Sequence, residues 1–545
     1  MPKPPSPRFS LSPKVSQAPR SLGGRAKQYL DSDAKQYLDR VKVAKQYLDS
    51  DAKQYLNSDA KQYLDRVKVA KQYLNSDAKQ YLNRVSLVLG FLILLLVGCR
   101  DDSYFSGKNS LQYSSDTVWF DTVFTRKPGS SYPISVTKIV SIKNPEKLPV
   151  MASFGLAGGS ASPYRVSVDG KTGIDIRDIE IGAEDSVFVF VQCKLEANNQ
   201  NYPLLVVDSL IAKVNGSEQK TILAAYGWDA HYFHDTIFNA NTTFGDADKP
   251  YVIVGYMGVE SGASLSVKAG VQIFASAQSS LYVAGTLDIQ GSAAKRVSIR
   301  GNKPAWETQF MPNQWRGIHF LVGSSNNRIQ YADIGNAVIG IRVDSLSVNL
   351  APGLQLLNTR IQYCGQACLL GVTASIEAEN CLFADAGTYS FLGLLGGQYR
   401  FNHCTFADYS GFSPRSSGHF ALSNTLRDAY GKLLDHAALN CSLYNSIVYG
   451  YNKEELQFNQ STLSAFVLHI ENNVLKTENP DGLLVFPNFQ NKNPNFIDTK
   501  RGHYALDTLS SAYKKAGVFG NAVITDILGK PRKPLADIGC YERTP

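Results

Sequence analysis

The second half of the chain repeats one short pattern, in NNRIQYADIG (326–335), NTRIQYCGQA (358–367), NCLFADAG (380–387), NHCTFADYSG (402–411) and YNSIVYGYNKE (444–454). The copies share an [Ile/Cys]-x-[Tyr/Phe] core with an asparagine just upstream. Asn358, Asn380 and Asn402 are 22 residues apart, and Asn445 follows 43 residues later, close to two further periods. A period near 22 with one apolar strand per repeat predicts a parallel β-helix.

The turns of such a coil stack about 4.8 Å apart, so equivalent residues form ladders along it. We therefore expect the asparagines to link neighbouring turns through amide hydrogen bonds. Cys381 and Cys404 should be small buried residues of a core ladder. Upstream, short strands broken by glycines, as in VESGASLSVKAGVQIF (259–274), continue the pattern. We place the coil at residues 250–510.

Residues 116–232 show a different β pattern. Stretches such as YRVSVDG (164–170) and DSVFVFVQCKL (185–195) are short, rich in β-branched and aromatic residues, and roughly alternating. Turn signals such as Asp169-Gly170 and Asn215-Gly216 separate them. Six or seven strands in about 130 residues predict an antiparallel β-sandwich. The predicted fold class is all-β, with this sandwich followed by the coil.

Residues 1–84 are of low complexity. The pentapeptide AKQYL begins at Ala26, Ala34, Ala44, Ala52, Ala60, Ala70 and Ala78. Each unit has too few apolar residues to bury a core, so we expect a disordered or helical repeat. The near-identity of the copies indicates a translated DNA repeat and a start site assigned too early, with the true start near Leu82.

An uncharged apolar run, VSLVLGFLILLLVG, fills residues 85–98. It is shorter than the roughly 20 residues that span a bilayer, but it fits the hydrophobic part of a signal peptide. Leu96-Val97-Gly98-Cys99 resembles the lipobox of bacterial lipoproteins, which implies cleavage before Cys99 and acylation at that residue. Arg100-Asp101-Asp102 resembles the surface-export tag of some Gram-negative lipoproteins. These resemblances imply a lipid tether at 99–115 and an outer-membrane protein, facing either the cell exterior or the periplasm.

The charge of the chain depends on whether that leader is counted. Residues 1–98 hold 17 Lys and Arg against 8 Asp and Glu, whereas residues 99–545 hold 38 against 39. The net charge of +8 for the whole chain therefore becomes −1 after the leader, and we expect no nucleic-acid partner. Seven cysteines remain after Cys99 without a CxxC pair, so neither a disulfide framework nor a zinc site is predicted.

Two resemblances concern the folded part of the chain. Its β-sandwich region resembles the Ig-like domains that follow the lipid tether in bacterial surface lipoproteins, although it lacks a Cys…Trp…Cys core. This resemblance implies a spacer, with a binding module as the alternative. Residues 250–545 resemble the right-handed parallel β-helix (pectin-lyase-like) superfamily, through the glycine-rich opening and Trp315-Arg316-Gly317.

The C-terminus resembles the closing segment of β-helix surface proteins, which commonly reads Ser-Pro-Ala-x-Asp-x-Gly, then Asp-x-x-Gly-x-x-Arg, and then Asp-Ile-Gly-x-Tyr-Glu. The matching residues are Asp526, Gly529, Arg532, Asp537, Ile538, Gly539, Tyr541 and Glu542. Ala512 and Lys515 depart from the family's Pro and Asp. Arg532 can bridge Asp537 or Glu542, and we expect residues 511–545 to cap the last coil, with Asp526, Arg532, Asp537 and Glu542 as capping residues.

Candidate catalytic residues form a column of acids in the repeats: Asp333, Asp385 and Asp408. Two carboxylates about 5 Å apart suit a retaining glycosidase or half of a Ca²⁺ site, and Arg360 lies in the same turns as a possible base. The alternative is that these aspartates bind backbone amides at turns. The family's hydrolases carry Gly-His-Gly, of which SSGHFALS (416–423) has only half.

No cofactor is predicted, with Ca²⁺ as the one ion the acids allow. His231-x-x-His234-Asp235 lies in an expected linker and has no third ligand nearby. We expect a non-catalytic surface protein whose coil binds a polysaccharide or another surface protein. The alternative is a polysaccharide lyase or glycoside hydrolase that uses the acids, which requires Asp333, Asp385 and Asp408 to converge in an open groove with Arg360. A third alternative is a purely structural role.

Overall fold

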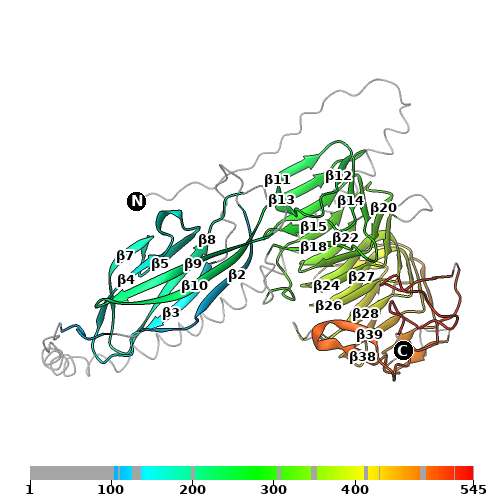
Figure 1. Ribbon diagram of the computed structural model, residues 1–545. Coiled ribbons are helices and arrows are strands. Elements are labelled where there is room, and N and C mark those ends of the chain that lie inside the picture. The colour runs from blue at the N-terminus through cyan, green and yellow to red at the C-terminus, as the bar shows by residue number, and fades with distance from the viewer. Residues whose placement is uncertain are drawn as a thin grey trace, which may run out of the picture. The chain divides into compact units, whose positions relative to one another are not determined.

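The structure is a computed structural model, which describes residues 103–108, 111–125, 137–197, 203–302, 308–344, 353–409, 411, 415–428, 430–478, 487–520 and 522–543. The low-complexity region 1–84, the signal segment 85–98 and Cys99 lie outside the described residues. Within the described part of the chain, almost all regular structure is β (Figure 1), which confirms the all-β prediction.

Two five-stranded sheets share one core in the N-terminal part of the described chain. One sheet contains β1 (Gln112–Tyr113), β3 (Thr137–Lys143), β8 (Ser186–Cys193), β5 (Tyr164–Val168) and β6 (Lys171–Gly173). The other contains β2 (Thr117–Phe124), β10 (Ser217–Trp228), β9 (Leu204–Val214), β4 (Val150–Leu156) and β7 (Asp175–Ile181). Alternate residues enter the core, as in β5, where Tyr164, Val166 and Val168 are buried.

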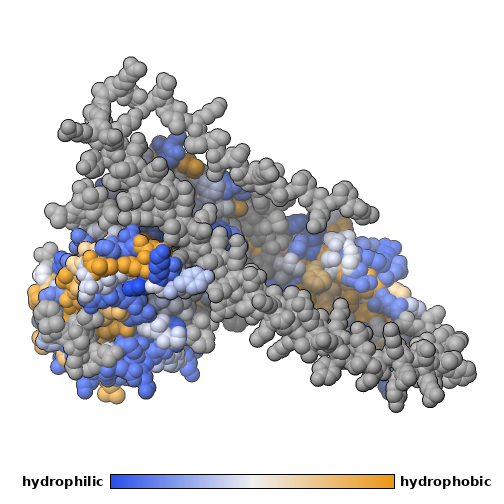
Figure 2. All heavy atoms as spheres, turned by 180° about the vertical axis from the view of Figure 1, so that it is seen from behind, coloured by the Kyte–Doolittle hydropathy of each residue, from blue (hydrophilic) through white to orange (hydrophobic). Residues whose placement is uncertain are grey.

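The sandwich departs from the sequence-based expectation in two places. Strands β2 and β10 pair in parallel, whereas the expected sandwich was wholly antiparallel. The expected tether 99–115 ends too late, because Leu111 is already buried in the sandwich core and β1 follows it directly. Exposed hydrophobic residues also lie on the outer faces of both sheets, including Trp119 and Phe188; Figure 2 shows such residues among hydrophilic ones on the molecular surface.

Most of the remaining strands form a parallel β-helix, in a 25-stranded sheet that runs from β11 (His231–Phe238) to β37 (Phe489–Gln490) and omits two short hairpins. The coil therefore begins before the expected residue 250. The expected linker is wrong, because β11 pairs with β13 (Tyr251–Val259) and β12 (Thr242–Phe244) pairs with β14 (Ser264–Lys268). The imidazole of His231 lies 2.8 Å from Asp246 and that of His234 lies 3.3 Å from Asp235.

Each turn of the coil contributes to three rows of strands. The first, here named the groove row, contains the second half of β13, β16 (Ser280–Val283), β19 (Gly317–Phe320), β22 (Ile339–Asp344), the first half of β25 (Ala367–Glu379), the first half of β27 (Tyr389–Asn402), β29 (Phe420–Ser423) and β34 (Leu456–Asn459).

The second, the polar row, contains β12, β14, β17 (Thr286–Gln290), β20 (Asn327–Gln330), β23 (Leu354–Leu357), the second halves of β25 and β27, β32 (Leu439–Tyr444) and β35 (Phe466–Glu471). The third, the covered row, contains β15 (Gln272–Ala275), β18 (Val297–Gly301), β21 (Ala332–Gly335), β24 (Arg360–Cys364), β26 (Leu382–Ala386), β28 (Thr405–Asp408), β33 (Ile447–Gly450), β36 (Val474–Leu475) and β37.

Inward-facing residues form ladders of like side chains. In the covered row one ladder consists of Ile273, Ile299, Ile334, Ile361, Phe383, Phe406, Val448 and Leu475. All eight are fully buried or nearly so. The predicted core positions of Cys381 and Cys404 are confirmed, since both are buried free thiols. Burial of this continuous apolar ladder is what the 22-residue repeat encodes.

Asparagines hold the corner between the polar row and the covered row. Asn358, Asn380, Asn445 and Asn472 have φ values of 50°, 52°, 46° and 60°, in the left-handed region that asparagine tolerates better than most residues. The predicted corner residue Asn402 is wrong by one position: Glu379 pairs with Asn402, so His403, with φ 50°, occupies the corner that follows.

The amide ladder is present over part of the coil. Asn472 donates to Asn445 at 2.8 Å, and Asn445 donates to Asn402 at 3.3 Å. The amides of Asn358 and Asn380 instead donate to the backbone oxygens of Asp526 and Thr525, both at 2.7 Å. The C-terminal part of the chain therefore takes over the role of the ladder in the earlier turns.

That part of the chain, residues 493–543, is here named the C-terminal segment. It contains β38 (Phe496–Asp498) and β39 (His503–Leu506), and it lies along the outer side of the covered row (Figure 1). Leu382, Ala384 and Ala407 face outward from the coil, yet they are buried against Tyr504, Ile527 and Tyr541. The expected cap on the last coil is thus corrected: the segment runs back along several turns.

The four expected capping residues hold this segment in shape. Arg532 forms an ion pair with Glu542 at 3.3 Å and donates to the side-chain oxygen of Asn380 at 2.7 Å, whereas it reaches Asp537 only through its backbone oxygen. The Asp526 carboxylate accepts backbone hydrogen bonds from Leu528, Lys530 and Glu542. The Asp537 carboxylate accepts from the backbones of Lys514 and Arg543.

Candidate functional site

The structure separates the three acids that the sequence placed in one column. Asp333 precedes the ladder residue Ile334, whereas Asp385 and Asp408 come two residues after the ladder residues Phe383 and Phe406. The similar tripeptides Tyr-Ala-Asp and Phe-Ala-Asp mislead, because Tyr331 is a corner residue with φ 49° and Phe383 is a core residue. Only Asp385 and Asp408 are equivalent.

Asp333 lies beside two arginines at the edge of the C-terminal segment. Its carboxylate accepts from Arg296 at 2.9 and 3.0 Å and lies 3.6 Å from Arg360. Arg296 also donates to the backbone oxygens of Ala332, Asn358 and Ile527. Arg360 is therefore paired with Asp333 and lies beside the C-terminal segment, which is a poor arrangement for a base.

Asp385 and Asp408 are buried beneath the C-terminal segment, with exposures of 1% and 4%. The hydroxyl of Tyr504 donates to Asp385, as does Gln362 at 3.2 Å. Burial raises the pKa of Asp385 to about 7, although the hydrogen bond from Tyr504 opposes that rise. Asp408 forms an ion pair with Arg415 at 2.6 Å. Because both carboxylates are covered, this geometry gives no support to a catalytic role.

A second buried cluster, Ser390, His419 and Glu455, has the residue types of a catalytic triad: a nucleophile, a base and an acid. Ser390 is hydrogen-bonded to Nδ1 of His419, whose Nε2 lies 3.8 Å from Glu455. All three residues have exposures of 0%, and Arg415 binds Glu455 at 2.9 Å. Burial lowers the pKa of His419 well below its ordinary value, and the nearby Arg415 lowers it further. This network binds the residues around 415–419 to the coil and offers no surface to a substrate.

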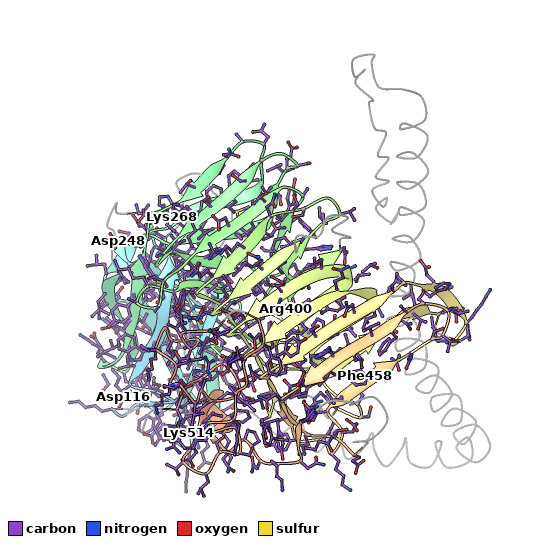
Figure 3. All side chains as sticks on the ribbon, turned by 90° about the vertical axis from the view of Figure 1, so that its right-hand side faces the viewer. Asp116, Asp248, Lys268, Arg400, Phe458 and Lys514 are labelled. Atoms are coloured by element: carbon purple, nitrogen blue, oxygen red, sulfur yellow. The ribbon has the colours of Figure 1, made fainter. Side chains whose placement is uncertain are left out.

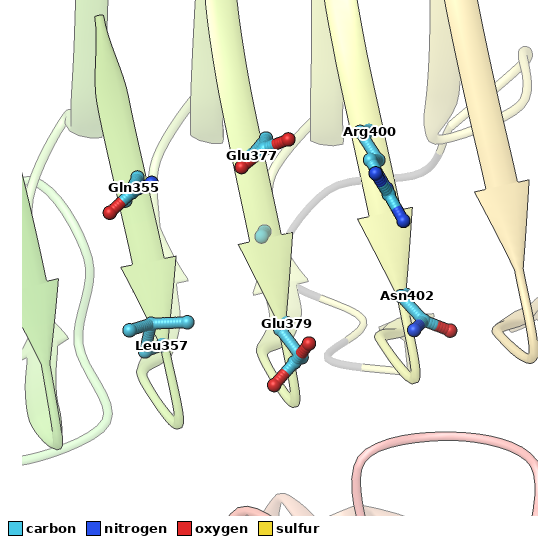
Figure 4. A pocket seen from close by; sticks show the side chains of 7 residues that line it. Gln355, Leu357, Glu377, Glu379, Arg400 and Asn402 are labelled. Atoms are coloured by element: carbon cyan, nitrogen blue, oxygen red, sulfur yellow. The ribbon is translucent and has the colours of Figure 1, made fainter. Parts of the chain in front are cut away.

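The polar row, by contrast, has an open outer face. A shallow depression of about 250 Å³ lies on it, lined by Gln355, Leu357, Glu377, Ala378, Glu379, Arg400 and Asn402. Figure 4 shows these side chains on three neighbouring strands, and in Figure 3 Lys268 and Arg400 mark the same row of strands. The site therefore consists of β23, β25 and β27 at the middle of the coil.

Strand register fixes the arrangement of these groups. Gln355, Glu377 and Arg400 are opposite one another, and Leu357, Glu379 and Asn402 form the next row (Figure 4). Side chains two residues apart on a strand point to the same side, with Cα atoms about 6.6 Å apart. Neighbouring strands lie about 4.8 Å apart. Two carboxylates, a guanidinium and two amides are thus held on a rigid lattice.

The charged groups of this site have no ion-pair partner among the described residues. Within that part of the chain, neither Glu377 nor Glu379 forms an ion pair, and the Arg400 guanidinium forms none either. Partial burial raises the pKa of Glu379 above its ordinary value, although Arg532 and Arg400 oppose the rise. A surface that leaves charges unpaired on rigid strands is suited to binding a ligand that supplies their partners.

Sequence reasoning missed this site because it followed the strands after the corner asparagines. The signal lies just before those corners, where SIEAE (375–379) and GQYRFN (397–402) alternate between apolar and charged or amide residues. Such alternation marks a strand with one buried and one open face. The alternation does not distinguish an ordinary solvated face from a binding face. That distinction requires the strand register and the observation that the charged side chains form no ion pairs among the described residues.

Among the described residues, no group of three or more His, Cys, Asp or Glu is arranged to hold a metal ion. The Ca²⁺ that the sequence allows remains a prediction without a ligand set in the described part of the chain. No helix among the described residues is long and apolar enough to cross a membrane.

No protein-family model matches the chain, and no curated protein matches it. Similar solved structures include the catalytic unit of a thermostable GH87 alpha-1,3-glucanase from Streptomyces thermodiastaticus strain HF3-3, at 12% identity over 64% of this chain and 76% of that chain, with a TM-score of 0.29. A family 123 glycoside hydrolase from Clostridium perfringens is 7% identical over 24% of this chain and 30% of that chain, with a TM-score of 0.17.

The E. coli chaperone DraB is 9% identical over 23% of this chain and 58% of that chain, with a TM-score of 0.16. This chain therefore spans less than two thirds of the length of the family 123 hydrolase and of DraB. Because all three TM-scores are low, the fold is assigned from the strand pairing described above, and the site is interpreted from its own geometry.

Proposed function

We propose that the protein binds a neutral, hydroxyl-rich carbohydrate chain on the open face of the polar row and does not cleave it. The observation that carries this proposal is the depression lined by Glu377, Glu379 and Arg400, whose charges form no ion pair among the described residues. The depression is shallow and open, which suits a polymer lying on a surface.

The chemistry of the site selects the ligand class. Carboxylates only accept hydrogen bonds and a guanidinium only donates them, whereas a sugar hydroxyl does both. A polyanion would be repelled by Glu377 and Glu379, and a cationic ligand would be repelled by Arg400. A neutral hydroxyl-bearing ligand satisfies all three groups without burying an unpaired charge.

The setting of this site is also part of the proposal. Acylation at Cys99 would hold the protein in the outer membrane, with the coil at the cell surface, and the sandwich would act as an Ig-like spacer. A net charge near −1 for residues 99–545 supports a partner other than nucleic acid. Another surface protein is the second partner that the sequence allows.

A glycoside hydrolase is the second candidate, favoured by one observation. Glu377 and Glu379 point to the same side of β25, and the pKa of Glu379 is raised, as a general acid requires. Their Cα separation of about 6.6 Å is compatible with carboxyl separations of about 5–5.5 Å in retaining or about 6.5–9.5 Å in inverting enzymes.

The test is a glycan array followed by calorimetry, on the full chain with Cys99→Ser to prevent acylation. We expect a neutral polysaccharide to bind, and both Glu377→Gln and Arg400→Ala to weaken binding at least tenfold. Lys220→Ala, which removes an exposed cation from the sandwich, should bind like the wild-type chain.

Product analysis on the same samples separates the two candidates. Binding without new reducing ends or unsaturated products supports the non-catalytic function. Turnover that disappears in Glu377→Gln or Glu379→Gln would replace it with the hydrolase. If no glycan binds, or if Arg400→Ala and Lys220→Ala bind equally well, the proposed site is wrong.

A further inference from the structure

The outer face of the groove row carries a second continuous line of side chains. Strand register places Tyr282, His319, Arg342, Leu370, Leu392, Ala421 and Gln457 opposite one another on successive turns. None of these residues belongs to the depression described above. The line begins with polar and aromatic groups, continues over leucines, and ends in a groove.

The polar end is built around one carboxylate. Asp344 accepts from Nε2 of His319 at 2.8 Å and from Arg342 at 2.8 and 3.0 Å. Burial opposes ionisation of Asp344, but these hydrogen bonds outweigh it and lower its pKa. The imidazole of His319 is thus held in one orientation beside the Tyr282 ring, whose centre lies 5.8 Å away. Partly exposed polar groups in a fixed geometry can bind hydroxyls at this end.

The other end is a groove of about 590 Å³, bounded by the hairpin of β30 (Thr425–Arg427) and β31 (Leu433–His436) beside β27, β29 and β34. Its lining includes apolar groups from Tyr389, Leu392, Leu394 and Leu426, and polar groups from Ser423, Thr425, Arg427, Gln457, Asn459 and Gln460. No carboxylate lines it among the described residues. The side-chain oxygen of Gln457 is buried there without a hydrogen-bond partner.

We propose that this face is a second carbohydrate site, which takes a separate chain, so that one protein molecule links two glycan chains. This inference rests on the proposed function. A sugar ring has an apolar C–H side, which suits the tyrosine and leucines, and hydroxyls, which suit the polar lining groups of Ser423, Thr425 and Asn459. A volume near 590 Å³ lies within the usual range for ligand sites.

The two faces cannot serve a single straight chain. Strand β27 lines both, but it turns between them at Leu395, Gly396 and Gly397, which have φ values of 56°, 75° and 122°. An added Cβ at Gly397 would lie 2.6 Å from the backbone oxygen of Ala374, so the tight corner requires glycine. Along the groove face, His319 and Ala421 are four turns apart, or about 19 Å, which an extended oligosaccharide can span.

The test is a bridging assay on the full chain with Cys99→Ser. The unlabelled glycan found by the array is immobilised, protein is bound to it, and capture of fluorescent soluble glycan by the bound protein is measured. Two variants alter the groove: Ala421→Phe places a ring in it, and Gln457→Ala removes a polar lining group. Gln192→Ala, at an exposed site on the sandwich, is the matched control.

We expect the wild-type chain and Gln192→Ala to capture labelled glycan. Ala421→Phe and Gln457→Ala should bind the immobilised glycan as before but lose at least tenfold of the capture. Light scattering of the same protein in solution checks that it is monomeric, because a dimer with one site per subunit would also link two glycan chains. If Ala421→Phe does not fold, Gln457→Ala still decides.

Binding without capture by the wild-type chain, or capture that survives both groove variants, would overturn the second site and leave the proposed function intact. Absence of any glycan binding would contradict both. Capture lost in the groove variants while binding persists is the one result that supports two independent sites.

Discussion

At the scale of single residues, the structure turns predicted catalytic groups into buried structural ones. Asp385 is the clearest case, because its carboxyl group is enclosed by Tyr504 and Gln362 rather than exposed to a ligand. Its raised pKa follows from burial, which disfavours the charged form. A raised pKa can make a carboxyl group a useful acid in catalysis. In this buried position it makes the stability of the protein depend on pH.

The raised pKa of Asp385 predicts a loss of stability on going from acid to neutral pH. Its pKa is about 7 in the folded chain and near 3.8 in a model peptide, so the native state binds the proton more tightly. The stabilising contribution is full below about pH 4 and is lost as pH rises through 7. At about 1.4 kcal/mol per pKa unit, the whole loss is roughly 4 kcal/mol, of which about 3 kcal/mol falls between pH 5 and pH 8.

Urea unfolding of the wild-type chain and Asp385→Asn at pH 5 and pH 8 measures this effect. The wild-type chain should lose more stability between the two pH values than the variant, whose amide does not ionise. Asp175→Asn, at an exposed ion pair, should behave like the wild-type chain. Identical pH dependence in Asp385→Asn and the wild-type chain would contradict the assignment.

At the scale of elements, the C-terminal segment is the part that the sequence described least well. The contacts of Asp526, Asp537 and Glu542 hold the internal shape of the segment, but the motif that contains them does not specify where the segment lies. Arg532 connects these two levels, because it bonds to Glu542 within the segment and to Asn380 on the coil. Its side chain is 2% exposed, as is expected of a paired charge removed from water.

Arg532→Ala should therefore destabilise the protein by about 3–5 kcal/mol, the usual loss when one partner of a buried ion pair is removed. The reason is that Glu542 and Asn380 keep their desolvation penalty without a partner. Thermal unfolding of the purified variant measures the change. Arg177→Ala, which removes an exposed arginine on the sandwich, should change the stability by less than about 1 kcal/mol. Equal effects of the two substitutions would show that the segment is not held by Arg532.

At the scale of the whole molecule, the open faces of the coil and the anchor belong to one proposal. A surface-bound glycan is useful to a cell only if the protein that holds it is attached. The leader and Cys99 lie outside the described residues, so this part of the proposal rests on the lipobox resemblance alone.

Cys99→Ser should release the protein from the membrane fraction in a Gram-negative host. The substitution removes the thiol that carries the diacylglycerol, and the apolar run 85–98 is shorter than the roughly 20 residues that span a bilayer. Immunoblots of membrane and soluble fractions, with mass spectrometry of the N-terminal peptide, measure the outcome. Cys193→Ser is the control, since that cysteine is buried in the sandwich core. A wild-type protein without acyl groups would contradict the anchor.

The sequence by itself determined the coil, because alternation and corner asparagines are local properties that repeat every turn. It also determined where most turns begin, although Asn402 was misplaced by one residue, since two adjacent residues can both meet the local pattern. What it could not determine was which face of the coil remains open. All three rows have similar strands, and the choice depends on contacts between distant residues, such as Tyr504 with Asp385, 119 positions apart. Only the tertiary structure decided that the C-terminal segment covers Asp385 and Asp408 and leaves Glu377, Glu379 and Arg400 facing the solvent.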